Sequence, residues 1–266
     1  MFQTIKSLLP PGVLTFLRNN FSKYGWFGNY SNWDLAARES SGYDKQEIVQ
    51  KVRSSLLKVK NGEVSFERDS VLFDEVQYSW PLLSALLWIA AKHQGKLNVI
   101  DFGGSLGSSF FQNRKFLQAL PEVKWNIVEQ SNFVEIGQKD FESEQLKFYH
   151  SIDECMKDGQ PNCILFSSVI QYLPDPFKFL EEVVKKKIEN IIFDRTPFIT
   201  GDTDRITIQK VNPRIYAASY PCRFFSETKF KKIFEKEYIL VESFDSLDVA
   251  NFNAQFKGLL YTRKPA

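Results

Sequence analysis

The chain has few of the residues that build metal sites, disulfide frameworks and hydrolytic triads. Its 266 residues include three cysteines (Cys155, Cys163 and Cys222) and two histidines (His93 and His150). The cysteines are odd in number and show no C-x-x-C spacing, so we expect neither disulfides nor a zinc site, and a cytoplasmic location is the simplest. Two histidines leave little for a histidine-based metal centre or a Ser-His-Asp hydrolase, and we predict no bound metal.

Long apolar runs and an excess of charge are also lacking. No stretch reaches the roughly 18 apolar residues needed to span a bilayer, and the N-terminus has no signal-peptide pattern, so we expect a protein that is not exported. The net charge of +2 argues against a nucleic-acid partner. Residues 2–21 can form an amphipathic helix interrupted by Pro10 and Pro11. Peripheral membrane contact is one use of it, and packing on the main domain or a partner subunit is the favoured one. The oligomeric state does not follow from the sequence.

What the chain does contain is an apolar run that ends in an acid and a glycine-rich turn. Residues 97–107 read L-N-V-I-D-F-G-G-S-L-G. Val99 and Ile100 predict a buried parallel strand, and the glycines let the backbone turn tightly and approach a ligand. Asp101 lies at the carboxyl end of the strand, where open α/β sheets bind ligands. The cofactor-binding residues predicted here are Asp101, Gly103, Gly104, Ser105 and Gly107.

A second acidic position indicates which cofactor the turn serves. The predicted strand that follows ends at Glu129, roughly 20 residues after Gly107, where a carboxylate suits two ribose hydroxyls. A ligand-free tight turn would leave Glu129 unexplained. Nicotinamides, flavins and S-adenosylmethionine all bind such turns, but an acid before the first glycine is the form that class I methyltransferases use. We therefore predict S-adenosylmethionine, with Gln130 beside Glu129 as a further cofactor-binding residue.

Strand and helix patterns alternate from residue 97 onward, which predicts a parallel sheet. Strands are expected at 97–102, 124–129, 146–150, 162–168 and 190–194, and helices near 107–119, 131–140, 152–157, 175–187 and 226–236. Residues 238–244 and 256–262 are strand-like with no helix between them, which predicts an antiparallel hairpin. The predicted fold is α/β, a Rossmann-like class I methyltransferase with a seven-stranded, mostly parallel sheet. Residues 1–95 are predicted to form a helical cap, and residues 96–266 the methyltransferase domain.

Polar side chains follow the later strands and are candidates for chemistry. Ser167 and Ser168, after the fourth strand, are predicted to contact the cofactor, and Tyr172 to contact the acceptor. Asp194 ends the fifth strand and can orient or deprotonate an acceptor hydroxyl, while Arg195 can bind an anionic part of it. An Asp-Arg ion pair that only fixes the loop is the alternative.

His150 is the second candidate base, because its ordinary pKa suits proton transfer near neutrality. The alternative for His150 is a spacer at the pocket edge. Residues 199–225 form a long insertion that we expect to be a lid or binding loop. Its arginines suit an anionic acceptor, or they pack on the aromatic segment 24–33. The substrate-binding candidates in the insertion are Arg205, Arg214 and Arg223.

Several segments together resemble a bacterial family of S-adenosylmethionine-dependent methyltransferases. They are G-N-Y-S-N-W (28–33), S-G-Y-D (41–44), D-F-G-G-S-L-G-S-S (101–109), W-N-I-V-E-Q (125–130), S-S-V-I-Q-Y-L-P-D-P (167–176) and D-R-T-P-F (194–198). That family is often encoded among genes for cell-surface polysaccharides. The resemblance implies O-methylation of a sugar, sugar nucleotide or related glycan precursor, and it carries over no catalytic residue.

Two other functions stay open at this stage. The first is a nicotinamide-dependent, sugar-modifying oxidoreductase, although Tyr172 is followed four residues later by Pro176, so the Tyr-x-x-x-Lys pair of short-chain dehydrogenases is missing. The second is a non-catalytic, methyltransferase-like scaffold subunit. In the favoured function, the protein mainly aligns and desolvates an acceptor oxygen or nitrogen for in-line methyl transfer.

Overall fold

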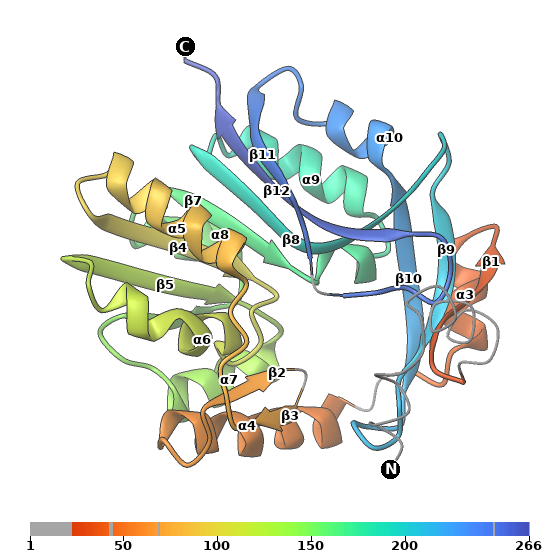
Figure 1. The fold of residues 1–266 in the computed structure, drawn as a ribbon, viewed down its shortest axis with the longest axis horizontal. Helices are drawn as coiled ribbons and strands as arrows, with labels where there is room; N and C mark the ends of the chain where they lie inside the picture. The colour runs from red at the N-terminus through yellow and green to blue at the C-terminus, as the bar shows by residue number, and fades with distance from the viewer. Residues whose placement is uncertain (1–22, 43–44, 69, 247, 266) are drawn as a thin grey trace, which may run out of the picture.

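The structure, a computed structural model, describes residues 23–42, 45–68, 70–246 and 248–265. The expected amphipathic helix at 2–21 lies outside these residues. From residue 96 onward, strands alternate with helices (Figure 1). The strands are β4 (Lys96–Phe102), β5 (Glu122–Val128), β6 (Leu146–Tyr149), β7 (Cys163–Ser167) and β8 (Asn190–Ile199). The helices are α6 (Ser108–Leu117), α7 (Ser131–Asp140), α8 (Ile152–Lys157), α9 (Pro176–Lys185) and α10 (Glu227–Lys232).

The predicted mostly parallel sheet with a terminal hairpin is confirmed. The parallel strands lie in the order β6-β5-β4-β7-β8. Strand β12 (Gln255–Arg263) then pairs antiparallel with β8, and β11 (Tyr238–Asp245) pairs antiparallel with β12. The carboxyl ends of the five parallel strands therefore share one edge, where a ligand site is expected.

Both faces of this sheet are buried, which explains why its strands are apolar runs. Because neighbouring side chains on a strand point to opposite faces, Ile192 and Phe193 lie in different cores. Ile192 packs with α4 (Lys45–Lys60), α5 (Trp80–Lys92), α6 and α7, and Phe193 packs with α8 to α10. Trp125 of β5 is fully buried in the first core. None of the helices in the described ranges combines the length and apolarity needed to cross a membrane.

The insertion after β8 is a β-hairpin, so the expectation of a long loop over 199–225 is wrong. Strands β9 (Arg205–Lys210) and β10 (Ser219–Ser226) pair antiparallel, and the end of β10 pairs parallel with the end of β8. Strand β1 (Gly25–Tyr30) pairs antiparallel with β9. The alternation around Ile206 and Ile208, both buried against Ala36, is the strand pattern that the sequence analysis overlooked. With these additions the sheet has ten strands in the described residues, rather than seven.

The N-terminal segment contains strands as well as helices, so a purely helical cap is wrong. Strand β1 and helix α3 (Trp33–Glu39) pack on β9 and β10, at the right of Figure 1. Helices α4 (Lys45–Lys60) and α5 (Trp80–Lys92) and the hairpin of β2 (Phe66–Arg68) and β3 (Val71–Phe73) pack on the main sheet or α6 instead. The N-terminal segment thus packs partly on the inserted hairpin and partly on the main sheet and α6. A domain boundary at residue 95 stays a prediction.

Candidate functional site

The glycine turn after β4 is held by close contacts on both sides. A Cβ on Gly103, whose φ is +71°, would lie 2.3 Å from Cγ2 of Val169 in the loop after β7. A Cβ on Gly104 would lie 2.5 Å from Cγ of Asp101. Gly107, with φ +106°, is the N-cap of α6. The turn therefore requires glycine at these positions for its own packing as well as for a ligand.

Asp101 lies in β4, and its side chain packs against Gly104 of the turn. Its side chain is 1% exposed, and Oδ2 accepts a hydrogen bond of 2.9 Å from Nε1 of Trp125. Oδ1 has no hydrogen-bond partner among the described residues. Burial raises the pKa of Asp101 to about 7, against its ordinary value of 3.8. Asp101 is therefore a buried, partly protonated carboxyl group near neutral pH.

Glu129, the acid predicted to bind the ribose of the cofactor, lies beside the glycine turn. It follows β5, is half-buried, and accepts a hydrogen bond of 2.7 Å from the backbone N–H of Gln130. Burial raises the pKa of Glu129, and the backbone of Gln130 and that of Ser105 in the glycine turn oppose the rise. Ser105 has a φ of +56°, a left-handed conformation that costs a non-glycine residue about 1–2 kcal/mol. Gln130 is exposed.

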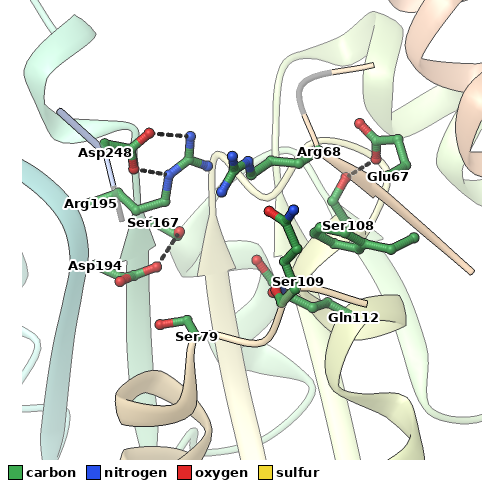
Figure 2. Close-up of a pocket in the computed structure, with 12 residues that line it drawn as sticks. Glu67, Arg68, Ser79, Ser108, Ser109, Gln112, Ser167, Asp194, Arg195 and Asp248 are labelled. Carbon is green, nitrogen blue, oxygen red and sulfur yellow. Dashed lines mark hydrogen bonds and ion pairs between the residues drawn. The ribbon is translucent and has the colours of Figure 1, made fainter. Parts of the chain in front are cut away.

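A polar pocket lies beyond the turn, at the carboxyl end of β7 (Figure 2). It meets β8 at Asp194 and Arg195, in the middle of that strand, which continues to Ile199 and does not end at Asp194 as expected. The pocket volume of about 60 Å³ holds only a few water molecules, so part of a ligand at most enters it. Helix α6 begins at its wall with Ser108 and Ser109. The lining residues are Phe66, Glu67, Arg68, Gln77, Ser79, Ser108, Ser109, Gln112, Ser167, Asp194, Arg195 and Asp248.

Asp194 is the buried acid of this pocket. Its side chain is 2% exposed, and Oδ2 accepts a hydrogen bond of 3.1 Å from the Ser167 hydroxyl. Oδ1 has no hydrogen-bond partner among the described residues. Burial raises the pKa of Asp194, against the opposing effects of Arg195 and Ser167. Asp194 and Ser167, predicted from separate segments, thus form one hydrogen-bonded pair.

Arg195 is anchored beside Asp194 in a left-handed conformation, with φ +54°. Its Nε donates to Oδ2 of Asp248 at 2.7 Å, and its Nη2 donates to Oδ1 at 3.3 Å. The pair is bidentate and half-buried, a geometry that fixes both side chains. Gln171, fully buried, donates to the Arg195 carbonyl and to the Ser168 hydroxyl. Ser168 is therefore held in the loop behind the pocket and is not part of its lining.

Two other predicted residues lie away from the pocket. His150 is exposed and follows β6, which is separated from β7 by β4 and β5 in the sheet. Its backbone N–H donates to Glu154. Tyr172 packs edge-on against Tyr220, and its hydroxyl donates to Gln209 of the inserted hairpin.

The three arginines of the insertion also lie outside the pocket. Arg205 donates twice to the carbonyl of Gly28, and its guanidinium stacks 4.2 Å from the ring of Phe252. Arg223 pairs with Asp204 at 3.3 Å. The side chain of Arg214 is exposed. The packing alternative of the sequence analysis thus describes Arg205 and Arg223.

The sequence analysis missed several pocket residues, chiefly Glu67, Arg68 and Asp248. Strands β2 and β3 are three residues each, too short for a periodic signal. Asp248 lies in the connection between β11 and β12 and reaches Arg195 only through the fold. Within the described residues, no group of three or more His, Cys, Asp or Glu side chains could hold a metal ion.

A mostly parallel sheet that ends in the antiparallel β12-β11 pair is the arrangement predicted in the sequence analysis. The fold is Rossmann-like. No family model and no curated protein matches the chain. Solved structures are similar to it at low identity. The N-terminal domain of EvdMO1 in the presence of SAH and D-fucose is 12% identical, with 84% of this chain and 98% of that chain covered and a TM-score of 0.48.

Two further solved structures resemble the chain to the same degree. A LepI variant in complex with SAH and a substrate analogue is 12% identical, with 82% of this chain and 55% of that chain covered and a TM-score of 0.49. Magnesium protoporphyrin IX methyltransferase from Synechocystis PCC 6803 with bound SAM is 12% identical, with 84% and 99% covered and a TM-score of 0.46. At this level the likeness concerns the course of the chain, so function is argued from the residues of the site.

Proposed function

We propose that this protein is an S-adenosylmethionine-dependent methyltransferase. The observation that carries the proposal is that Glu129 lies close enough to the backbone of Ser105, at the carboxyl edge of the sheet, for that backbone to favour its ionised form. It joins the acid after β5 to the glycine turn after β4. A polar pocket with the buried acid Asp194 lies next along the same edge.

The residues at the turn fit the cofactor chemically. A carboxylate offers about four acceptor positions, and Glu129 uses one on the backbone N–H of Gln130. The remaining positions suit the two hydroxyls of a ribose. Gly103 and Gly104 let the turn pack closely against Val169 and Asp101, which sets its backbone at the edge of the sheet where the amino-acid end of the cofactor would bind.

The chemistry divides between the cofactor and the pocket. S-adenosylmethionine supplies an electrophilic methyl group on a sulfonium, so the protein needs to align the acceptor and exclude water. We propose that Asp194, through Oδ1, would accept the proton that the acceptor hydroxyl loses as its oxygen bonds to the methyl carbon, while the bond from that carbon to sulfur breaks and S-adenosylhomocysteine leaves. A pKa raised by burial brings this carboxylate closer to the working pH, which favours a general base.

We propose a hydroxyl-rich acceptor, namely a sugar, sugar nucleotide or related precursor of a surface glycan. Polar side chains make up most of the pocket wall, which suits an acceptor that offers many hydrogen bonds. The family resemblance described above supports the same class. We propose a small-molecule or glycan acceptor. We also propose a cytoplasmic location, since the three cysteines are free and buried.

Calorimetry with S-adenosylhomocysteine tests the proposal. We expect micromolar binding, about −8 kcal/mol, and a loss of about tenfold or more in Glu129→Ala, because hydrogen bonds to a charged group contribute about 1.5–3 kcal/mol. Glu144→Ala is the matched control, because Glu144 is exposed after α7. Binding of NADH in place of S-adenosylhomocysteine would contradict the proposal.

Turnover is tested separately, by incubating the protein with S-adenosylmethionine and candidate sugar nucleotides. Mass spectrometry should show a gain of one methyl group. Cofactor binding without methylation of any such acceptor would favour a non-catalytic scaffold subunit.

A further inference from the structure

The β2-β3 hairpin forms the wall of the pocket opposite β8. The carboxylate of Glu67, 2% exposed, accepts a hydrogen bond of 2.7 Å from the Ser108 hydroxyl and one of 2.6 Å from the Ser70 backbone N–H. Ser108 is the first residue of α6, where the positive end of the helix dipole favours a carboxylate. Glu67 thereby ties the hairpin to the start of α6.

Arg68, the next residue, turns away from this tie and reaches across the pocket. Figure 2 shows its guanidinium group extending toward that of Arg195 on the opposite wall. The ring of Phe73 in the paired strand lies 6.0 Å from Cζ of Arg68 and supports the side chain. Among the residues that the structure describes, no carboxylate forms an ion pair with Arg68.

The other charges of the pocket are already matched. Asp248 binds Arg195 through two hydrogen bonds, and Glu67 is satisfied by Ser108 and Ser70. Asp194 accepts a hydrogen bond from the Ser167 hydroxyl, and the charge of the neighbouring Arg195 favours its ionised form. Arg68 is the cation of this wall that remains, and an anion bound beside it would compensate its charge.

We propose that Arg68 binds a carboxylate or phosphate group of the methyl acceptor, opposite Arg195 and Asp248. The proposal rests on the proposed function and names the class of its substrate. A hydroxylated acid or a sugar phosphate would bind with its anion at Arg68 and its hydroxyl at Asp194. A neutral sugar would leave Arg68 without a partner.

The order of the strands favours the acceptor over the cofactor as the source of this anion. Glu129 follows β5 and the glycine turn follows β4, so the ribose and amino-acid ends of the cofactor belong to that part of the edge. Asp194 and Arg195 lie in β8, two strands further along, past β7. Arg68 points to this far end.

Paired ligands that differ in charge test the proposal. Glucuronate and glucose differ in one carboxylate, and glucose 6-phosphate adds the phosphate arm. Calorimetry on the protein saturated with S-adenosylhomocysteine should show at least about tenfold tighter binding of one anion than of glucose, as expected for a charge-assisted hydrogen bond. Arg68→Gln should abolish this preference. Arg68→Lys should retain part of it, because lysine keeps the charge and loses the planar fork.

Arg214→Gln is the matched control and should behave as the wild type, because Arg214 is exposed outside the pocket. Equal losses in both variants would show a general charge effect and overturn the proposal, as would a wild-type protein that binds neither anion. Thermal unfolding of each variant shows whether it is folded.

The cofactor arm separates the two sources of a carboxylate. S-adenosylhomocysteine carries one, and 5′-methylthioadenosine lacks it. If Arg68→Gln weakens the first tenfold and leaves the second unchanged, the anion at Arg68 is the cofactor's own and the proposal is overturned. If the wild type binds neither nucleoside, the proposed function fails, whereas the sugar pairs titrated without cofactor still test Arg68.

Discussion

The indole N–H of Trp125 donates its hydrogen bond to the carboxyl group of Asp101 on the neighbouring strand, 2.9 Å away. The two residues come from adjacent parallel strands, and both are buried. This bond is the only one that the Asp101 side chain makes among the described residues, since Oδ1 has no partner. The carboxyl group that supports the glycine turn is therefore held in an environment that favours its protonated form.

Asp101 should make the protein less stable as the pH rises. Its folded-state pKa of about 7 lies above the ordinary value of 3.8, so the stabilising protonated form is present at low pH and is lost between about pH 4 and pH 7. Each pH unit in that window corresponds to at most about 1.4 kcal/mol. Urea unfolding at about pH 5 and pH 8 should show a smaller decrease for Asp101→Asn than for the wild type. Equal decreases would mean that Asp101 is ionised throughout.

Gly103 and Val169 should be energetically coupled. Gly103→Ala should cost about 1–2 kcal/mol from its left-handed backbone plus the clash with Cγ2 of Val169 at 2.3 Å. Val169→Ala removes Cγ2, the closest clashing atom, and leaves Cβ at 2.9 Å. In a double-mutant cycle measured by urea unfolding, the double variant should therefore be more stable than the sum of the single effects predicts. Strict additivity would show that the loop after β7 moves aside freely.

Arg223 should contribute to stability and not to acceptor binding. Its guanidinium pairs with Asp204, whose side chain is 5% exposed and also accepts from the backbone N–H of Ser226. Arg223→Ala should lower the unfolding free energy by about 1–3 kcal/mol, while Arg214→Ala changes it by less than about 0.5 kcal/mol. Calorimetric unfolding of the two variants provides the comparison. A raised acceptor KM in Arg223→Ala with unchanged stability would contradict the assignment.

Asp194 and His150 should differ in their effect on turnover. If Asp194 is the base, Asp194→Asn should lower kcat by about 10²–10⁴-fold and leave the affinity for S-adenosylhomocysteine nearly unchanged. His150→Gln should retain kcat, because His150 is exposed beyond β5 and outside the pocket lining. Steady-state kinetics with an identified acceptor decides between them. Full activity in Asp194→Asn would leave alignment alone as the source of catalysis.

The sequence was informative where the signal is local and repeated. Buried runs such as residues 97–102 and 162–168 mark parallel strands, and the acid and glycines after the first run mark the turn. Their order along the chain then predicts the shared edge. The link between Ser105 and Glu129 could be anticipated for the same reason, since each follows a neighbouring strand.

The pocket depends on contacts that no local pattern encodes. Arg195 meets Asp248, which is 53 residues away in the sequence, and Arg68 comes from a strand of three residues. The inserted hairpin carries the period-two alternation of a strand around Ile206 and Ile208, although its arginines suggested a ligand-binding loop. Arg205 binds a carbonyl in β1, far away in sequence, and such a partner is visible only after folding.

The pairing of β1 with β9 has a consequence for synthesis of the chain on the ribosome. Gly25 is among the first described residues to emerge, yet its partner is Lys210. Until that partner leaves the exit tunnel, Trp26 and Phe27 have no strand to pair with, and the nascent chain presents them to chaperones or to other nascent chains. Deleting β9 and β10 should therefore yield a chain that aggregates through its N-terminal strand, even where the central parallel strands have formed.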